Sequence, residues 1–254
     1  GLMLPHASAV AAPKTKPRPQ TADDAPLLEM NQAFKKGDRR RLSALLPQVR
    51  GHVLEPWGAY WELAARLDET GPTEIRTFLS RYAGTYQEDR LRNDWLLLLG
   101  KRRDWATFAA EYPKFRMNDD RSVRCYALLN EAQTSDTDVA AQVQELWLAQ
   151  KEADEGCAAA AEQQLEAGKL KAHTAWLRAR RGFENERPRI ATQAVGLLNP
   201  DWVASVNAIY ANPVRFLDDK ITALRPRTKE LVTLALIRLA STDTTAAMDE
   251  MNKV

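Results

Sequence analysis

Residues 88–115, which read EDRLRNDWLLLLGKRRDWATFAAEYPKF, predict two helices joined by a tight turn. Apolar residues recur in the first half at i, i+4, i+7 and i+8, which is the spacing of one helical face. These residues are Leu91, Trp95, Leu98 and Leu99. Gly100 follows them and predicts a helix end, because glycine readily takes the left-handed conformation that ends many helices. Asp104 predicts the N-cap of a second helix with the apolar face Trp105, Phe108, Ala109 and Tyr112.

The same two-helix pattern recurs along most of the chain and indicates an all-α protein. About fifteen segments have helical spacing, and none shows the period-2 alternation that predicts a strand. Clear examples are residues 25–36, 38–47, 54–67, 119–132, 157–167 and 229–240, and a last helix is expected at 244–253. The loops between them are short, so consecutive helices should be antiparallel neighbours.

We expect these hairpins to stack into a degenerate α-solenoid, a superhelix with a curved or ring-segment shape. The seven tryptophans fall roughly one to each hairpin. No strict consensus repeat of about 34 residues is present, so the array is not a regular one. A compact bundle is the competing architecture, but many short helices with no long central helix favour the stacked superhelix.

The two ends of the chain differ from its helical body. Residues 1–22 contain an apolar start, a run of small residues and a basic, proline-rich linker, which resemble the remnant of an export signal. The helical domain is expected over residues 23–254. Because the pattern stops inside an amphipathic helix, the sequence predicts that this domain is truncated at its C-terminal end.

Composition and charge exclude several classes of function. The chain is 44% hydrophobic and 28% charged, which is ordinary for a globular protein. With 36 basic and 34 acidic residues its net charge is +2, so no case arises for binding nucleic acid. No membrane span is expected, since the most apolar stretch, residues 231–240, is short and includes Arg238.

No motif for a cofactor, a metal ion or catalysis is present. The sequence has no GxGxxG and no phosphate-binding Walker loop. His6, His52 and His173 are isolated from one another, and two cysteines alone do not make a zinc site. Acidic residues are too numerous for any pair of them to be singled out. We therefore predict no catalytic residue, no metal and no cofactor in this chain.

Three basic runs are the candidates for contact with a ligand. They are Arg39, Arg40 and Arg41; Lys101, Arg102 and Arg103; and Arg178, Arg180 and Arg181. All lie at or near predicted helix ends, where cations favour the helix dipole, so solvated end charges are the simpler interpretation. The alternative is a concave surface that meets an anionic polymer.

Cys125 and Cys157 could form a disulfide. One lies inside a predicted helix, and the other begins a helix two elements later. Helices two apart in a solenoid stack side by side, so a bridge is geometrically plausible, and closing a loop of this length could stabilise the fold by about 3–4 kcal/mol. The alternative is two buried free thiols.

Several segments resemble the N-terminal superhelical, U-shaped domain of the soluble lytic transglycosylases. They are WGAYWEL at 57–63, RLRNDWL at 90–96, LGKRRDW at 99–105, CYALL at 125–129, ELWL at 145–148 and GC at 156–157. The resemblance covers about residues 54–212. It implies a periplasmic protein whose parent enzyme cleaves the glycan strands of peptidoglycan to 1,6-anhydromuropeptides. In this family the two matching cysteines are paired, which implies a Cys125–Cys157 disulfide.

The chain departs from the family where the chemistry lies. The catalytic domain of the family carries a Glu-Ser-x-x-Phe segment and a Gly-Leu-Met-Gln segment, and this sequence has neither. The resemblance therefore implies a scaffold that is inactive alone. It implies glycan strands as partners of the parent enzyme, with other cell-wall proteins as further candidates. The alternative hypothesis is a stand-alone periplasmic adaptor that binds proteins. In either case Trp95 and Trp105 are predicted to pack between helices, because both lie on apolar stripes.

Overall fold

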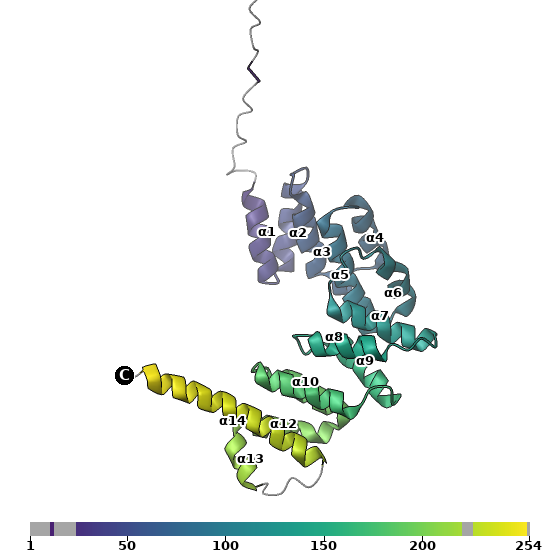
Figure 1. Ribbon diagram of the computed structural model, residues 1–254. Helices are drawn as coiled ribbons and strands as arrows, with labels where there is room; N and C mark the ends of the chain where they lie inside the picture. The colour runs from purple at the N-terminus through teal and green to yellow at the C-terminus, as the bar shows by residue number, and fades with distance from the viewer. Residues whose placement is uncertain (1–10, 13–23, 220–225, 253–254) are drawn as a thin grey trace, which may run out of the picture. The chain divides into compact units, whose positions relative to one another are not determined.

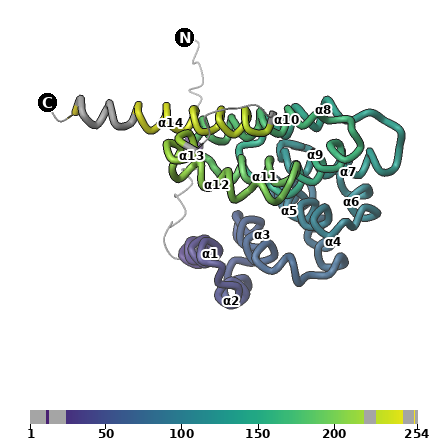
Figure 2. Tube along the Cα trace, turned by 90° about the horizontal axis from the view of Figure 1, so that it is seen from below, coloured from purple at the N-terminus to yellow at the C-terminus, as the bar shows by residue number. Residues whose placement is uncertain are grey.

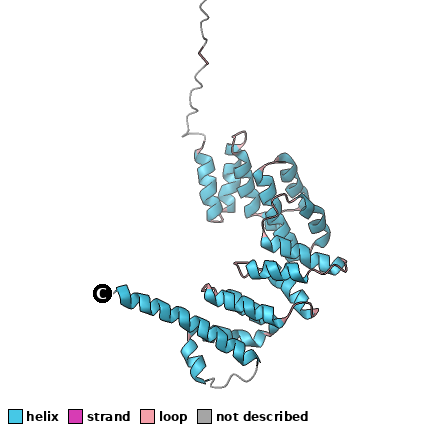
Figure 3. Cartoon of the chain, viewed as in Figure 1, coloured by secondary structure: helices cyan, strands magenta, loops and turns pink. Residues whose placement is uncertain are grey.

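The fold was analysed in a computed structural model, which describes residues 11–12, 24–219 and 226–252. Within these residues the chain forms fourteen α-helices and three 3-10 helices and contains no strand (Figures 1 and 3). The all-α prediction is confirmed. The chain divides into two compact units, residues 1–91 and 92–254, and the boundary falls inside one helix, α5 (Tyr86–Arg102).

The first unit packs its helices around a small apolar core. Its elements before α5 are α1 (Ala25–Lys35), α2 (Arg39–Val49), α3 (Glu55–Ala65), η1 (Leu67–Glu69) and α4 (Pro72–Arg81). Met30, Leu42, Leu45 and Val49 are almost fully buried where α1, α2 and α3 meet. Gly58 permits the close approach of α3, since a Cβ there would lie 2.9 Å from Val49 Cγ2.

The second unit continues with helices that contact those one or two places along the sequence. Its elements after α5 are α6 (Trp105–Glu111), η2 (Tyr112–Lys114), α7 (Arg121–Thr134), α8 (Ala140–Ala149), α9 (Glu155–Glu166), α10 (Ala172–Glu184), α11 (Pro188–Leu198), η3 (Pro200–Trp202), α12 (Val203–Ala211), α13 (Pro213–Asp219) and α14 (Pro226–Asn252). Helices α7, α8 and α9 pack together, as do α10 and α11 (Figure 2). This is the contact pattern of stacked helical hairpins. Helix α14 departs from it and lies against α10, α12 and α13.

The predicted end of the first hairpin helix at Gly100 is wrong. The helix continues past Gly100 to Arg102, and Arg103 takes the left-handed conformation with φ 59°. The N–H of Asp104 donates to the carbonyl of Leu99 (3.0 Å), and that of Arg103 donates to the carbonyl of Gly100 (3.1 Å). These two bonds form a Schellman motif whose left-handed residue is Arg103. Of the predicted stripe, Leu91, Trp95 and Leu99 are buried, and Leu98 is only partly so.

Gly100 serves packing and not the helix end. A Cβ there would lie 2.5 Å from the Tyr126 ring, which also contacts Gly156 of α9. The Arg103 guanidinium lies 5.6 Å from the centre of the Tyr126 ring and donates to the Gly100 carbonyl at 2.6 Å. These contacts hold Arg103 in a conformation that non-glycine residues rarely adopt.

Two further helix ends were predicted wrongly. Helix α2 passes the expected stop at Pro47 and ends at Val49, whose side chain is fully buried. The two helices expected at 229–240 and 244–253 form one helix, α14. The hydroxyls of Thr242 and Thr244 donate to the carbonyls of Arg238 and Ala240, so these polar residues are satisfied without breaking the helix. No helix in the described ranges is both long enough and apolar enough to cross a membrane.

Candidate functional site

The two histidines that the structure describes, His52 and His173, belong to different units of the chain. His52 Nε2 lies 2.7 Å from Asp24 Oδ1 in the first unit, and its Nδ1 accepts from the Leu54 N–H at 2.9 Å. His173 is exposed on α10, and His6 lies outside the described residues. Among the residues that the structure describes, no group of three His, Cys, Asp or Glu side chains could hold a metal ion.

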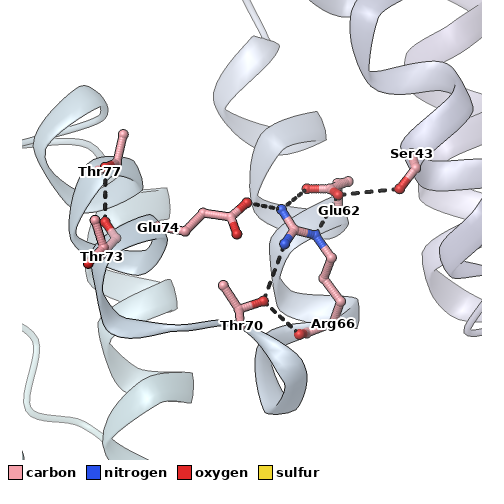
Figure 4. A network of polar contacts seen from close by, with 7 residues as sticks. All are labelled: Ser43, Glu62, Arg66, Thr70, Thr73, Glu74 and Thr77. Atoms are coloured by element: carbon pink, nitrogen blue, oxygen red, sulfur yellow. Dashed lines mark hydrogen bonds and ion pairs between the residues drawn. The ribbon is translucent and has the colours of Figure 1, made fainter.

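The first unit contains a pocket of about 230 Å³ between α2, α3 and α4, with a charged network at one end (Figure 4). Arg66 is the centre of this network. Its Nε donates to Glu62 Oε1 at 2.6 Å, and its Nη2 donates to Glu74 Oε1 at 2.5 Å. The bond from Arg66 lowers the pKa of Glu74, and the bonds from Glu74 and Glu62 raise the pKa of Arg66. Glu74 therefore stays an ionised carboxylate at neutral pH.

A second ion cluster lies at the other end of the same pocket. Glu55 accepts from Arg50 and from Arg81, each at 2.9 Å, and Arg50 also donates to the Tyr82 hydroxyl at 3.1 Å. Burial tends to raise the pKa of Glu55, but the hydrogen bond from Arg50 and the charge of Arg81 lower it overall. Burial raises the pKa of Tyr82.

The pocket of the first unit is consequently balanced in charge. Three arginines pair with three carboxylates in the two clusters. Glu55 and Glu74 have lowered pKa values, so neither offers a proton for general-acid chemistry at neutral pH. These contacts tie α2, α3 and α4 together and leave little charge for a ligand.

The first two basic runs are also engaged in contacts within their own units. Arg39 forms ion pairs with Asp68 (3.0 Å) and Glu69 (3.1 Å), and Arg41 pairs with Glu29. Arg103 of the second run lies over the Tyr126 ring, as described above. The interpretation as helix-end charges fits these residues better than an anion-binding surface does.

Each arginine of the third basic run has its own partners. Arg178 is buried and donates from Nη1 to the carbonyl of Gln150 (2.6 Å) and from Nη2 to that of Glu152 (2.9 Å). Burial lowers the pKa of Arg178 to about 10, so it still carries its charge at neutral pH. Arg180 pairs with Glu230 of α14 at 2.6 Å, and Arg181 reaches the Leu148 carbonyl at 3.5 Å.

Arg178 and Arg181 line a basic hollow of the second unit, between the end of α8 and the turn from α10 to α11. A pocket of about 470 Å³ there adjoins one of about 330 Å³, and both are lined by Lys151, Arg187 and Ile190. We call the two together the basic groove. Its charged side chains are Lys151, Glu152, Arg178, Arg181, Arg187 and Arg189. Five cations and one carboxylate make it the candidate functional site.

Sequence reasoning found part of this site and missed the rest. Arg178 and Arg181 belong to a predicted run. Lys151 and Arg187 come from two connecting segments, and Arg189 comes from the first turn of α11, and no pattern linked these three to the run. The available signal was the ENERPR sequence at 184–189, which places two arginines around a proline at a helix start.

The tryptophans pack as expected, and an aromatic pocket was missed. Trp95 is only 2% exposed, and Trp105 is partly buried against Phe108 and Tyr126. Trp176 and Trp202 stack with their ring centroids 6.0 Å apart beside a pocket of about 460 Å³. The Arg227 guanidinium already lies 5.2 Å from the centre of the Trp202 ring, so that ring has a cationic partner within the chain.

Cys125 of α7 and Cys157 of α9 are joined by a disulfide in the structure. Their Cα atoms lie 4.9 Å apart, and both side chains are fully buried. The bond links two helices that already pack against each other. No free cysteine remains among the described residues.

Comparison with known proteins finds solved structures with a similar fold. No family model matches the chain, and no curated protein matches it. Among solved structures, the 70 kDa soluble lytic transglycosylase of Escherichia coli is similar, with 17% identity and a TM-score of 0.56 over 89% of this chain. A complex of the 70 kDa soluble lytic transglycosylase with bulgecin A gives 17% identity and a TM-score of 0.54 over the same share.

An inactive mutant of the lytic transglycosylase Slt from Pseudomonas aeruginosa is 24% identical over 90% of this chain, with a TM-score of 0.49. This chain spans 37% of the length of the first two proteins and 38% of the third. The similarity to the first two shows that the helical fold of this chain is the fold of helical regions in soluble lytic transglycosylases, as the sequence predicts.

Proposed function

We propose that this chain is the superhelical scaffold of a soluble lytic transglycosylase that acts on the glycan strands of peptidoglycan. The observation that carries the proposal is the fold, which matches such enzymes along almost nine-tenths of the chain. The sequence segments that resemble the family, and the pairing of Cys125 with Cys157, support it independently. The product of the complete enzyme would be 1,6-anhydromuropeptides.

In this proposal the helices position peptidoglycan and another part of the enzyme performs the cleavage. The chain spans under two-fifths of the length of the matching structures. It also lacks the Glu-Ser-x-x-Phe and Gly-Leu-Met-Gln segments of the family's catalytic domain. We therefore expect residues 23–254 to act as one superhelical domain that binds the polymer and does not cleave it alone.

The proposed location is the periplasm. A disulfide between two buried cysteines is typical of proteins that fold in an oxidising compartment. The small-residue segment near the N-terminus, which resembles part of an export signal, supports the same location.

Sedimentation with purified peptidoglycan sacculi tests the proposal. We expect the purified chain to sediment with sacculi, a heat-unfolded sample of the same chain to define the background, and no 1,6-anhydromuropeptide to be released. If the chain stays in the supernatant while immobilised chain selectively retains periplasmic proteins, the scaffold proposal is wrong and the periplasmic adaptor is favoured. Release of 1,6-anhydromuropeptides by the chain alone would contradict the inactive state.

A further inference from the structure

The basic groove has more positive charge than its structural contacts require. Arg178, Arg181 and Arg187 donate to main-chain carbonyls at residues 148–152, where helix α8 ends. Those three cations donate to carbonyls in the last turn of α8 and in the connecting segment that follows it. Lys151 and Arg189 have no such role, because within residues 24–219 and 226–252 neither side chain forms a hydrogen bond or an ion pair. Both are exposed at the rim of the groove.

The nearby acidic groups do not neutralise this surplus. Glu152, the carboxylate that lines the groove, pairs with Arg187 at 3.1 Å. Glu186 occupies the turn between α10 and α11 but is directed to α14, where it accepts from Ser241 (3.3 Å) and pairs with Arg238 (3.8 Å). The groove therefore keeps a net positive charge, and two of its cations, Lys151 and Arg189, have no partner in the described chain.

Local backbone geometry holds the groove in shape. Gly182 lets α10 and α11 approach closely, since a Cβ there would lie 3.0 Å from the Arg187 carbonyl oxygen and 3.1 Å from the Ala191 nitrogen. Glu186 takes the left-handed conformation with φ 56°, and Asn185 donates to the Arg181 carbonyl at 2.8 Å. Arg187 belongs to this turn, and the other arginines of the groove belong to the two helices that it joins. The close packing of α10 and α11 therefore limits how far the backbone under these arginines can rearrange on binding.

The shape and lining of the groove favour a short peptide over a simple anion. The walls include the apolar side chains of Leu148, Ala149, Ala153, Pro188 and Ile190. Gln150 and Asn185 also line the larger lobe, but their amide nitrogens donate within the chain, to Ser122 Oγ (3.2 Å) and to the Arg181 carbonyl (2.8 Å). The lobes of about 470 and 330 Å³ lie in the size range of small-ligand sites, and Arg187 lines both of them.

We propose that the basic groove binds the carboxylate-bearing stem peptides of peptidoglycan. One carboxylate would lie between Lys151 and Arg181 in the larger lobe, and another beside Arg189 in the smaller lobe. Guanidinium groups suit carboxylates because they present paired N–H donors in a plane. The choice of stem peptides as the ligand rests on the proposed function, whereas the choice of a carboxylate peptide rests on the groove itself.

Calorimetric titration of the full chain with a soluble stem peptide, Ala-γGlu-diaminopimelate-Ala, tests the proposal. The groove variant is Lys151→Glu with Arg189→Glu. The matched control is Lys169→Glu with Arg124→Glu, which changes the same charges at exposed positions of the same unit. Circular dichroism establishes that both variants fold. We expect the groove variant to lose about tenfold or more in affinity, the control to bind as the unaltered chain does, and binding to weaken with added salt.

Three ligand controls separate the outcomes. The same peptide with its carboxyls converted to amides should not bind, and equal binding would refute carboxylate recognition. Equal binding of an oligoglutamate peptide would refute selection of stem peptides. If the chain binds sacculi and glycan strands stripped of peptides but not the stem peptide, the groove assignment is wrong and the scaffold proposal survives. If it binds neither sacculi nor stem peptide, both are wrong.

Discussion

Substituting Gly100 by alanine should destabilise the protein, although glycine inside a helix is normally unfavourable. Gly100 lies within α5 and has no positive φ, so alanine should gain about 1 kcal/mol from helix propensity. Its Cβ, however, would lie 2.5 Å from both Cγ and Cδ2 of Tyr126 and 2.9 Å from Cδ1. These contacts are closer than carbon atoms tolerate, so either the ring or the helix must move.

The Tyr126 ring has little space into which it could move. It is 3% exposed, and Gly156 of α9 contacts it too, with a hypothetical Cβ only 3.0 Å from Tyr126 Cε2. Overpacking of this kind costs about 1–3 kcal/mol. After subtraction of the propensity gain we expect Gly100→Ala to lower the unfolding free energy by up to about 2 kcal/mol, a fall of up to about 8 °C in Tm for a chain of this size.

Urea unfolding followed by circular dichroism measures this change. The control is Gly196→Ala in α11, where the nearest atom, Val203 Cγ2, is 3.2 Å from the added Cβ and belongs to a small side chain. In a Tyr126→Ala background, Gly100→Ala should lose its penalty and become neutral or stabilising, because the ring is gone. If Gly100→Ala alone stabilises the chain by about 1 kcal/mol, the packing argument is refuted and Gly100 is an ordinary helical glycine.

Three other predictions follow from the described contacts. Replacing Cys125 and Cys157 together by alanine should cost about 3–4 kcal/mol of unfolding free energy in urea, and two reactive thiols in the denatured, unreduced protein would contradict the bridge. Because the pKa of Glu55 is lowered, its ion pairs stabilise the fold fully at a pH above 4.5, the ordinary pKa of this group, and this contribution is lost as the pH falls through the lowered pKa. Glu55→Gln should therefore make the unfolding free energy less sensitive to acid, by at most about 1 kcal/mol for each exposed arginine partner. An unchanged dependence of the unfolding free energy on pH would argue against this role. Arg178→Ala should cost about 2–4 kcal/mol, because it removes a buried side chain and leaves two partly buried carbonyls without that donor, whereas Arg181→Ala, at an exposed position with one 3.5 Å contact, should stay within about 0.5 kcal/mol. Equal effects in thermal unfolding would show that Arg178 has no special role.

The helix boundaries that were predicted wrongly have more than one cause. At Pro47 the helix continued to Val49, which is buried against other helices, and at Gly100 it continued because Arg103, which contacts Tyr126, takes the left-handed position in place of the glycine. At residues 241–244 a polar run suggested a break, but hydroxyls of threonines bonded back to the helix carbonyls. Intrinsic preferences of about 1 kcal/mol are too small to resist such contacts.

The basic groove shows a different limit of sequence reasoning. Its cations come from positions 151, 178, 181, 187 and 189. Lys151 is therefore at least 27 positions along the sequence from the other four cations. Sequence identified Arg178 and Arg181 as part of one run. Only the fold shows that Arg178 donates to carbonyls of the segment after α8, while Lys151 and Arg189 stay without a partner among the described residues.

The sequence by itself determined that this chain is a succession of amphipathic helices with short connections, because helical periodicity and caps act over only a few residues. It also indicated the family of folds and the pair of cysteines. The tertiary structure decided that Gly100 packs against another helix and that Arg103 ends α5. It also decided which arginines donate to main-chain carbonyls and which cations remain available to a ligand. These properties depend on distances between residues far apart in the chain, and local patterns carry no information about such distances.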